Sequence, residues 1–397
     1  MSIIKTEHQP RLSAAVNRIQ PSGIRRFFDL ASSMDNIISL GVGEPDFSTP
    51  WNIREASIHS LERGVTSYTA NAGLLELRAA ISKYLLERFG VDYHPESEVI
   101  VTVGASEGID LALRAIVDPG DEVLIVEPCF VSYAPLVSLA GGIPVPVPTS
   151  IDKNFEIDEN DLKERLTSKT KALMLSFPNN PTGAVMGKEG LAKVAEVVKD
   201  HNLVVLSDEI YAELTYDGDH TSFPSIEGMK ERTILISGFS KSYAMTGWRI
   251  GYLTAPKPYA EAMLKIHQYA MMCASTMAQY AALEAMTNGR EEMEEMIISY
   301  RQRRNYFVKS VKEIGLTCHS PGGAFYAFPS IAETGLSSEE FAEQLLLDQK
   351  VAVVPGHVFG AGGEGHIRCS YAASMEQLEE AIDRIGAFLK KLNESKG

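Results

Sequence analysis

The chain has 397 residues, of which 45% are hydrophobic and 22% charged, a length that predicts two or three structural units with a large core. Its 52 acidic and 37 basic residues give a net charge of −15, and no long lysine or arginine run is present, which disfavours nucleic acid and anionic membranes as partners. No apolar run resembles a signal peptide or reaches the ~20 residues of a membrane span, so we expect a cytoplasmic protein. The four scattered cysteines form no metal-binding or disulfide pattern, so we expect no metal site.

The N-terminal part predicts short elements around two loops. A helix is expected at 22–34 and a strand at 37–40, which ends in the loop Gly-Val-Gly-Glu-Pro-Asp-Phe at 41–47. Its two glycines allow the backbone to approach a ligand closely. Helices are expected at 51–63 and, from apolar residues at helical spacing, at 73–89. The loop between these helices carries Tyr68.

Short apolar runs then alternate with helical segments. This alternation predicts an α/β unit whose mainly parallel sheet is covered on both faces, and such sheets bind ligands at the carboxyl ends of their strands. The expected strands are 99–103, 123–126, 143–147, 172–176, 204–207 and 234–236, and the expected helices are 106–117, 161–167 and 189–201.

Beyond residue 256 the pattern changes to long helices with isolated strands. This segregated order predicts a second, smaller α+β unit, to which the segment through residue 40 can add. The expected helices are 259–287, 290–314, 338–349 and 375–392, and the expected strands are 322–328 and 367–371.

A lysine after the strand at 233–236 is the first candidate for chemistry. Lys241 lies in Ser-Gly-Phe-Ser-Lys-Ser-Tyr-Ala-Met-Thr-Gly-Trp-Arg-Ile-Gly-Tyr, where Arg249 is the only other charge. A lone lysine is usually a solvated surface charge. At a buried strand end, however, desolvation would lower the pKa of its amine and free it to attack a carbonyl, as a Schiff-base lysine must.

Other strand ends carry candidate binding residues. The turn Gly104-Ala105-Ser106 leads into a helix whose N–H groups and dipole suit a phosphate. Asn180 lies at the tip of the loop 177–183, and Asp208 follows a buried strand, so its carboxylate needs a cationic partner. Each feature alone is also compatible with an ordinary turn or a structural ion pair.

Together these residues match the needs of pyridoxal phosphate. That cofactor requires a lysine for its aldehyde, a carboxylate for its ring nitrogen, donors to its ring oxygen, an anion site and an aromatic face. The chain supplies them, in that order, as Lys241, Asp208, Asn180 with Tyr211, the 104–106 turn with Arg249, and Phe130.

Three motifs in a fixed order support a family resemblance: Asn-Pro-Thr-Gly at 180–183, Asp-Glu-Ile-Tyr at 208–211, and the segment 240–252. Over almost its whole length the sequence resembles a fold type I, class I pyridoxal-phosphate aminotransferase. The segments 22–25, 43–47 and 68–73 resemble the microbial branch of aromatic, aspartate and N-acetyl-diaminopimelate aminotransferases. The resemblance implies a large α/β domain over 46–289 with a mainly parallel seven-stranded sheet, and a small α+β domain from 1–45 and 290–397.

The resemblance also implies residue roles. Lys241 would form the Schiff base and move the proton between substrate Cα and cofactor C4′, and Asp208 would pair with the ring nitrogen. Asn180 and Tyr211 would bond the ring oxygen. Arg368 would grip the substrate α-carboxylate, with the Gly43 backbone and Asn180 beside the substrate. The other cofactor-binding residues would be Gly104, Ala105, Ser106, Phe130, Ser237, Ser240, Arg249 and, across a homodimer interface, Tyr68.

The family pattern leaves some points open. Gly238 stands where many relatives have serine or threonine, so the phosphate contact would come from Ser237, from Ser240 alone or from water. No arginine for a substrate side-chain carboxylate can be located, which disfavours strict dicarboxylate specificity.

The function expected from the resemblance is ping-pong transfer of an amino group between an L-amino acid and a 2-oxo acid such as 2-oxoglutarate. The donor is expected to be aromatic or one of a broad set that includes aspartate. A β-elimination lyase acting on sulfur amino acids shares the fold and the lysine. A non-catalytic effector-sensing domain is disfavoured, because no basic helix-turn-helix precedes the 41–47 loop.

Overall fold

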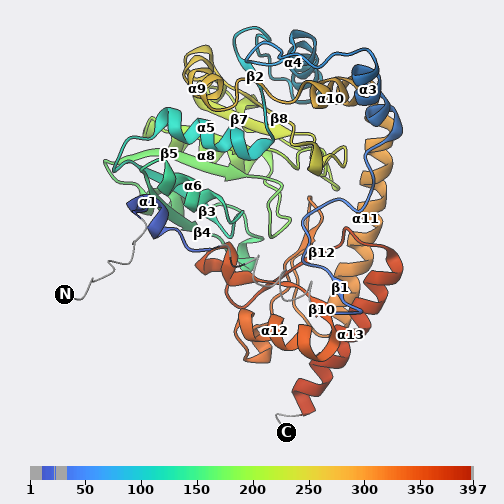
Figure 1. The fold of residues 1–397 in the computed structure, drawn as a ribbon. Helices are drawn as coiled ribbons and strands as arrows, with labels where there is room; N and C mark the ends of the chain where they lie inside the picture. The colour runs from blue at the N-terminus through green and yellow to red at the C-terminus, as the bar shows by residue number, and fades with distance from the viewer. Residues whose placement is uncertain (1–10, 22, 24–33, 395–397) are drawn as a thin grey trace, which may run out of the picture.

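A seven-stranded sheet forms the middle layer of the larger unit of the molecule (Figure 1). In the computed structural model, which describes residues 11–21, 23 and 34–394, its strand order is β2-β8-β7-β6-β5-β3-β4. β8 runs antiparallel to both neighbours and all other pairs are parallel, so the predicted α/β class with a mainly parallel sheet is confirmed. The strands are β2 (Val99–Thr102), β3 (Glu122–Glu127), β4 (Ile143–Pro148), β5 (Thr170–Ser176), β6 (Val204–Asp208), β7 (Thr233–Gly238) and β8 (Gly251–Thr254).

Helices cover both faces of this sheet because its buried strands alternate apolar side chains between the faces. In β7, Ile234 and Ile236 face one helical layer and Leu235 faces another. The first layer consists of α5 (Ala105–Ile116), α6 (Tyr133–Leu139) and α9 (Lys257–Ala270). The opposite face packs against α7 (Glu159–Arg165) and α8 (Lys188–Asp200) and, towards β2, against α3 (Trp51–Glu62), α4 (Leu75–Phe89) and α10 (Thr276–Asn288).

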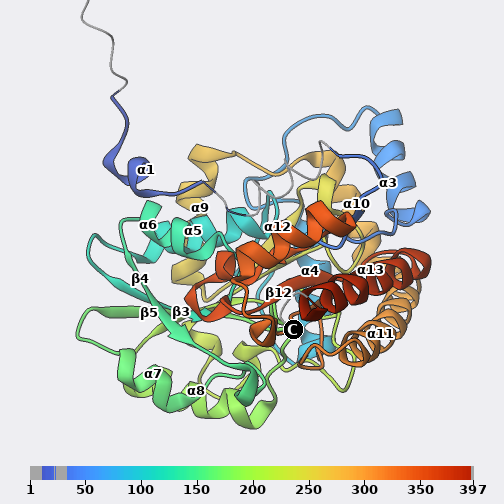
Figure 2. The same ribbon diagram turned by 90° about the horizontal axis from the view of Figure 1, so that it is seen from below.

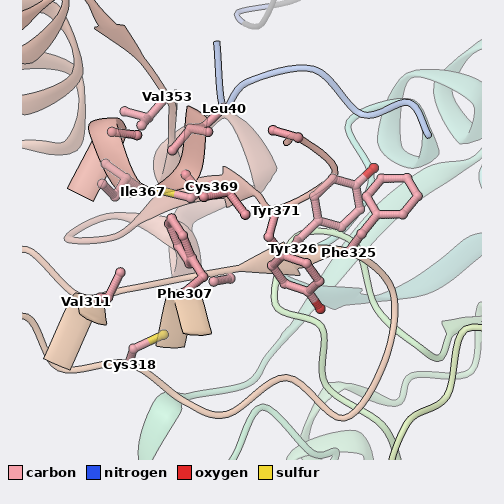
Figure 3. Packing of buried hydrophobic residues seen from close by; sticks show 14 of the residues in the cluster. Leu40, Phe307, Val311, Cys318, Phe325, Tyr326, Val353, Ile367, Cys369 and Tyr371 are labelled. Atoms are coloured by element: carbon pink, nitrogen blue, oxygen red, sulfur yellow. The ribbon is translucent and has the colours of Figure 1, made fainter. Parts of the chain in front are cut away.

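A smaller unit with its own core follows in the chain (Figures 1 and 2). Its helices surround short strands, and Figure 3 shows Phe307, Tyr326, Cys369 and Tyr371 within the apolar core. The helices are α11 (Arg290–Glu313), α12 (Ser338–Gln349) and α13 (Met375–Glu394). The strands are β9 (Tyr326–Ala327), β11 (Val354–Pro355) and β12 (Ile367–Ser370) in one sheet, and β1 (Ile38–Ser39) with β10 (Val351–Ala352) in another.

Several predicted elements differ from the observed ones. The single helix predicted at 259–287 is wrong, because α9 and α10 are separated at 271–275, where Met272 has a φ of 67°. The Met272 carbonyl accepts a hydrogen bond of 2.7 Å from the Asn71 side chain, which ties the break to the 68–73 loop. The strand predicted at 322–328 shortens to β9, because Ala324 has a φ of 56° and interrupts the extended backbone. α6 and β8 are not predicted, and the helix predicted at 22–34 lies outside the described residues except for 23 and 34.

The described N-terminal segment contacts both units. α1 (Ala14–Arg18) lies against α6 of the large unit (Figures 1 and 2), whereas β1 pairs in parallel with β10 of the small unit. We retain the division into 46–289 and 1–45 with 290–397 as a proposal, although α1 contacts α6 of the large unit. None of the helices described here is long and apolar enough to cross a membrane. Nor do the described residues contain a group of three or more histidine, cysteine, aspartate or glutamate side chains that could hold a metal ion.

Two glycines allow β7 and β8 to meet closely at the end that leads to Lys241. Gly238 pairs with Gly251, and a Cβ at Gly238 would lie 2.9 Å from the Gly251 Cα atom. A Cβ at Gly251 would in turn lie 2.8 Å from the backbone N of Ala105 at the start of α5. The residue that departs from the family pattern, Gly238, is therefore required by the backbone packing of this chain.

Replacing Gly238 with serine should therefore destabilise the protein, because the added Cβ forces β7 and β8 apart. We expect a loss of about 1–3 kcal/mol in the free energy of unfolding, measured by urea titration. Gly187→Ala is the matched control, since a Cβ there has no neighbouring atom within 4 Å. Equal stability of Gly238→Ser and the wild type would contradict this explanation.

Candidate active site

A cavity of about 600 Å³ lies at the carboxyl ends of the central strands and is also lined by residues of the small unit. Strands from distant parts of the sequence end here, as expected for a parallel α/β sheet. Most of the predicted site residues line it: Gly43, Ala105, Ser106, Phe130, Asn180, Asp208, Tyr211, Ser240, Lys241, Arg249 and Arg368.

Three predicted residues lie outside the cavity wall. The Ser237 hydroxyl donates to the backbone oxygen of Glu209 at 3.2 Å, so of the two serines considered for the phosphate only Ser240 lines the cavity. Gly104 lies behind the wall, against the Arg249 guanidinium. Tyr68 is 80% exposed on the single chain.

Lys241 projects from the segment after β7 towards the 41–47 loop. Its Nζ donates to the backbone oxygen of Gly43 at 2.6 Å and lies 5.9 Å from the ring centroid of Tyr211. Burial lowers the pKa of Lys241 to about 8, although the nearby Glu44 carboxylate acts in the opposite direction. At pH 7 about a tenth of the amine is therefore unprotonated, far more than for a solvated lysine.

Asp208 ends β6 and is 5% exposed. Its carboxylate accepts hydrogen bonds from the Tyr133 hydroxyl at 2.8 Å and from the Ile210 N–H at 3.1 Å. Burial raises the pKa of Asp208 to about 6, against the lowering effect of these two donors. Within the described chain no arginine, lysine or histidine forms a salt bridge with it. The described residues thus offer this carboxylate hydrogen-bond donors but no cation, and a cationic group of a ligand would complete the ion pair expected there.

Arg368 reaches the cavity from β12. Its Nη1 donates to Asn180 Oδ1 at 2.8 Å and its Nη2 to the backbone oxygen of Gly41 at 2.6 Å, while its buried Nε has no partner among the described residues. The guanidinium carbon lies 4.5 Å from the ring centroid of Tyr326 and 4.9 Å from that of Phe359. Because Arg368 occupies the amide oxygen of Asn180, the amide NH₂ is the group left to donate towards the cavity.

Tyr211 supplies a second donor beside Asn180. Its hydroxyl lies 2.8 Å from the hydroxyl of Tyr326. Burial raises the pKa of Tyr211 well above its ordinary value, so the phenol is protonated at neutral pH.

The opposite end of the cavity is suited to an anion. The first turn of α5 presents Ala105 and Ser106, and Arg249 faces it from a left-handed backbone conformation with a φ of 51°. A Cβ at Gly104 would lie 2.7 Å from the Arg249 Nη2, so this glycine lets the guanidinium and the helix N-terminus come together. Helix N–H groups, the helix dipole and the guanidinium all attract an anion to this end.

Two cavity residues, Tyr133 and Tyr326, are not identified from the sequence. Tyr133 lies three residues after Phe130, and their rings meet edge to face with centroids 5.7 Å apart. Tyr326 lies within the strand predicted at 322–328, but no motif distinguishes it from its aromatic neighbours. The further wall residues not identified from the sequence are Val42, Glu44, Ile109, Ser176, Ile210, Thr246 and Gly247.

These residues fit pyridoxal phosphate. The unpartnered Nε of Arg368 can receive a carboxylate, and the buried Asp208 lacks a cation. Lys241 has a lowered pKa, and the α5 N-terminus with Arg249 leaves no room for a Cβ at Gly104. An amine, a cationic ring nitrogen and an anion would each find a complementary group in this cavity.

Comparison with known proteins gives a consistent result along the chain. Residues 35–385 match the family described as aminotransferase class I and II. The chain is 63% identical to YugH of Bacillus subtilis (strain 168) over 380 residues, 96% of this chain and 98% of that protein. It is 46% identical to aromatic-amino-acid aminotransferase 2 of Thermococcus litoralis over 383 residues, again 96% and 98%. The structure of aspartate aminotransferase from Thermus thermophilus with maleate matches with a TM-score of 0.91 and 38% identity, covering 96% of this chain and 100% of that one.

The raised pKa of Asp208 predicts a pH-dependent contribution to stability. Between its ordinary pKa of 3.8 and about 6 the folded protein binds a proton that the unfolded chain releases, so this group makes folding less favourable as pH rises. Asp208→Asn should remove this pH-dependent contribution to the free energy of unfolding. In urea unfolding of cofactor-free protein, we expect the stability of wild type relative to Asp208→Asn to fall by about 2–3 kcal/mol between pH 4 and pH 7. A difference that stays constant with pH would contradict the assignment.

Proposed function

The chain belongs to the class I and II aminotransferases, and on that premise we propose that it moves an amino group from an L-amino acid to a 2-oxo acid such as 2-oxoglutarate. This family depends on pyridoxal 5′-phosphate, and the protein is an aminotransferase that uses it. One observation supports the assignment of the site most strongly: Lys241, Asp208 and Arg368, far apart in the sequence, line one cavity. Neither the lyase nor the effector-sensing alternative finds support in the comparisons.

When bound, pyridoxal 5′-phosphate supplies the aldehyde that accepts the amino group and a ring that takes up electrons. In our proposal Asp208 holds the proton on the ring nitrogen, and its burial strengthens that ion pair. Asn180 and Tyr211 donate hydrogen bonds to the ring oxygen. Phe130 stacks on the ring, and Ser240, Arg249 and the α5 N-terminus hold the phosphate.

Arg368 binds the substrate α-carboxylate in this proposal. Its Nε has no partner among the described residues, and its Nη2 is held only by the neutral Gly41 carbonyl. A carboxylate is a stronger acceptor than a peptide carbonyl and can take two guanidinium N–H groups at once. Binding there orients the substrate Cα towards Lys241, which accepts and returns the Cα proton because its pKa is near neutrality.

The amino donors we propose are aromatic amino acids or a broad set that includes aspartate, which correspond to the names of the similar proteins. Among the described wall residues, Arg249 and Arg368 are the arginines, and both already have a role. No further arginine is therefore assigned to a substrate side-chain carboxylate. Residues 21–28, which we expect to influence side-chain specificity, lie outside the described residues except for 21 and 23.

We further propose a homodimer. Tyr68 and Tyr269 are 80% and 89% exposed, and Met271 and Met272 are also exposed. The bond from Asn71 to the Met272 carbonyl holds these two loops together. A second copy that covers this apolar surface would remove it from water and bring Tyr68 to the phosphate of its neighbour.

The cytoplasmic location stays a prediction.

A half-reaction panel tests the function. Holoenzyme is mixed with single amino acids and the absorbance of the bound cofactor is followed; phenylalanine, tyrosine and aspartate should change it, and 2-oxoglutarate should restore it. Lys241→Ala should slow the change by about 10²–10⁴-fold or more, because no amine remains to move the Cα proton. Release of ammonia without a 2-oxo acid acceptor, or full activity of Lys241→Ala, would contradict the proposal.

A further inference from the structure

Tyr326 connects two parts of the site that the proposed mechanism treats separately. Its hydroxyl lies 2.8 Å from the hydroxyl of Tyr211, and its ring centroid lies 4.5 Å from the guanidinium carbon of Arg368. The side chain is 1% exposed and lines the cavity. Figure 3 shows Tyr326 with Phe325 and Tyr371 in the core of the small unit. One side chain thus contacts both the proposed carboxylate site and the proposed ring-oxygen site.

The hydrogen bond between the two phenols determines where the remaining proton points. Burial raises the pKa of both phenols, so both are protonated and only one can donate to the other. If Tyr326 donates, the Tyr211 hydroxyl proton is free to point into the cavity. If Tyr211 donates, it presents only a lone pair there, which cannot stabilise an electron-rich ring oxygen.

The position of Tyr326 is set by its own strand and by the preceding turn. β9 pairs with β12 so that Tyr326 lies opposite Ser370, two residues after Arg368. The backbone oxygen of Ala324 accepts hydrogen bonds from the hydroxyls of Tyr216 and, at 3.1 Å, Tyr371. This turn and the strand pairing hold the Tyr326 ring against the Arg368 guanidinium, which lies between Tyr326 and Phe359.

We propose that Tyr326 is a positioning residue: its hydroxyl donates to Tyr211 and so directs the Tyr211 proton at the cofactor ring oxygen, while its ring supports Arg368. This inference rests on the proposed function. It couples the carboxylate site to the ring-oxygen site through one side chain, and it separates the two roles between the hydroxyl and the ring of Tyr326.

Two variants of the holoenzyme separate these roles. Tyr326→Phe keeps the ring and loses the donor. A weaker hydrogen bond into the ring oxygen leaves more negative charge there, so the midpoint of the pH titration of bound-cofactor absorbance should rise by about 0.5–1 pH unit. Its KM for the amino acid should change by less than about twofold, because the cation–π contact remains. Tyr326→Leu also loses the ring, and its KM should rise by about 5–10-fold.

A double variant tests whether the effect passes through Tyr211. Tyr211→Phe alone should raise the titration midpoint, and adding Tyr326→Phe should raise it no further, because the two hydroxyls act as one chain. Tyr84→Phe is the matched control: it removes the 2.7 Å hydrogen bond from a partly buried phenol to Glu213, outside the cavity wall, and should titrate as wild type.

Each outcome decides the inference. If wild-type protein transaminates, two results would overturn the inference about Tyr326. One is a titration midpoint of Tyr326→Phe identical to that of wild type. The other is a shift from Tyr326→Phe that adds in full to the shift from Tyr211→Phe. A wild-type protein that neither binds pyridoxal 5′-phosphate nor transaminates would instead overturn the proposed function, and this inference with it.

Discussion

The burial of Asp208 and Arg368 and the partial burial of Lys241 in one cavity are the constraint on which the site depends. Burial raises the pKa of Asp208 and lowers the pKa of Lys241, so both groups move towards their neutral forms. Arg368 keeps its guanidinium between two aromatic rings with its Nε unpartnered. A buried charge without a partner is costly, so these groups favour the binding of a ligand whose charges complement them. The same desolvation provides an amine that is partly unprotonated near neutral pH.

The fold brings these groups together from distant parts of the chain. Backbone oxygens of Gly41 and Gly43, near the N-terminus, accept hydrogen bonds from Arg368 and Lys241. Glycines at 238 and 251 allow β7, β8 and the start of α5 to approach each other, which places the anion-binding end of the cavity beside the lysine segment. Small residues are needed at these points because the contacts are between backbones rather than side chains.

Much of the fold could be predicted from the sequence because its signals are local. The central strands are continuous apolar runs, and α12 begins at Ser338 because Ser337 and Glu340 form a reciprocal capping box that the chain encodes directly. The break between α9 and α10 was not predictable in this way, because 271–275 contains no proline or glycine and the Asn71 contact that fixes the break is tertiary. Tyr133 and Tyr326 were missed for the same reason. The orientation of Ser237 did have a local signal, since alternation along β7 places it on the face of Leu235, but the motif around Lys241 obscured it.

Lys241 is, in our proposal, the amine that reacts with the cofactor aldehyde. The most direct measurement is reduction of the holoenzyme with borohydride, followed by proteolytic digestion and mass determination of each peptide. We expect one pyridoxyl group per chain, on the peptide that contains Lys241 and absent from Lys241→Ala. A pyridoxyl group on another lysine, or none on any peptide of a holoenzyme that transaminates, would contradict it.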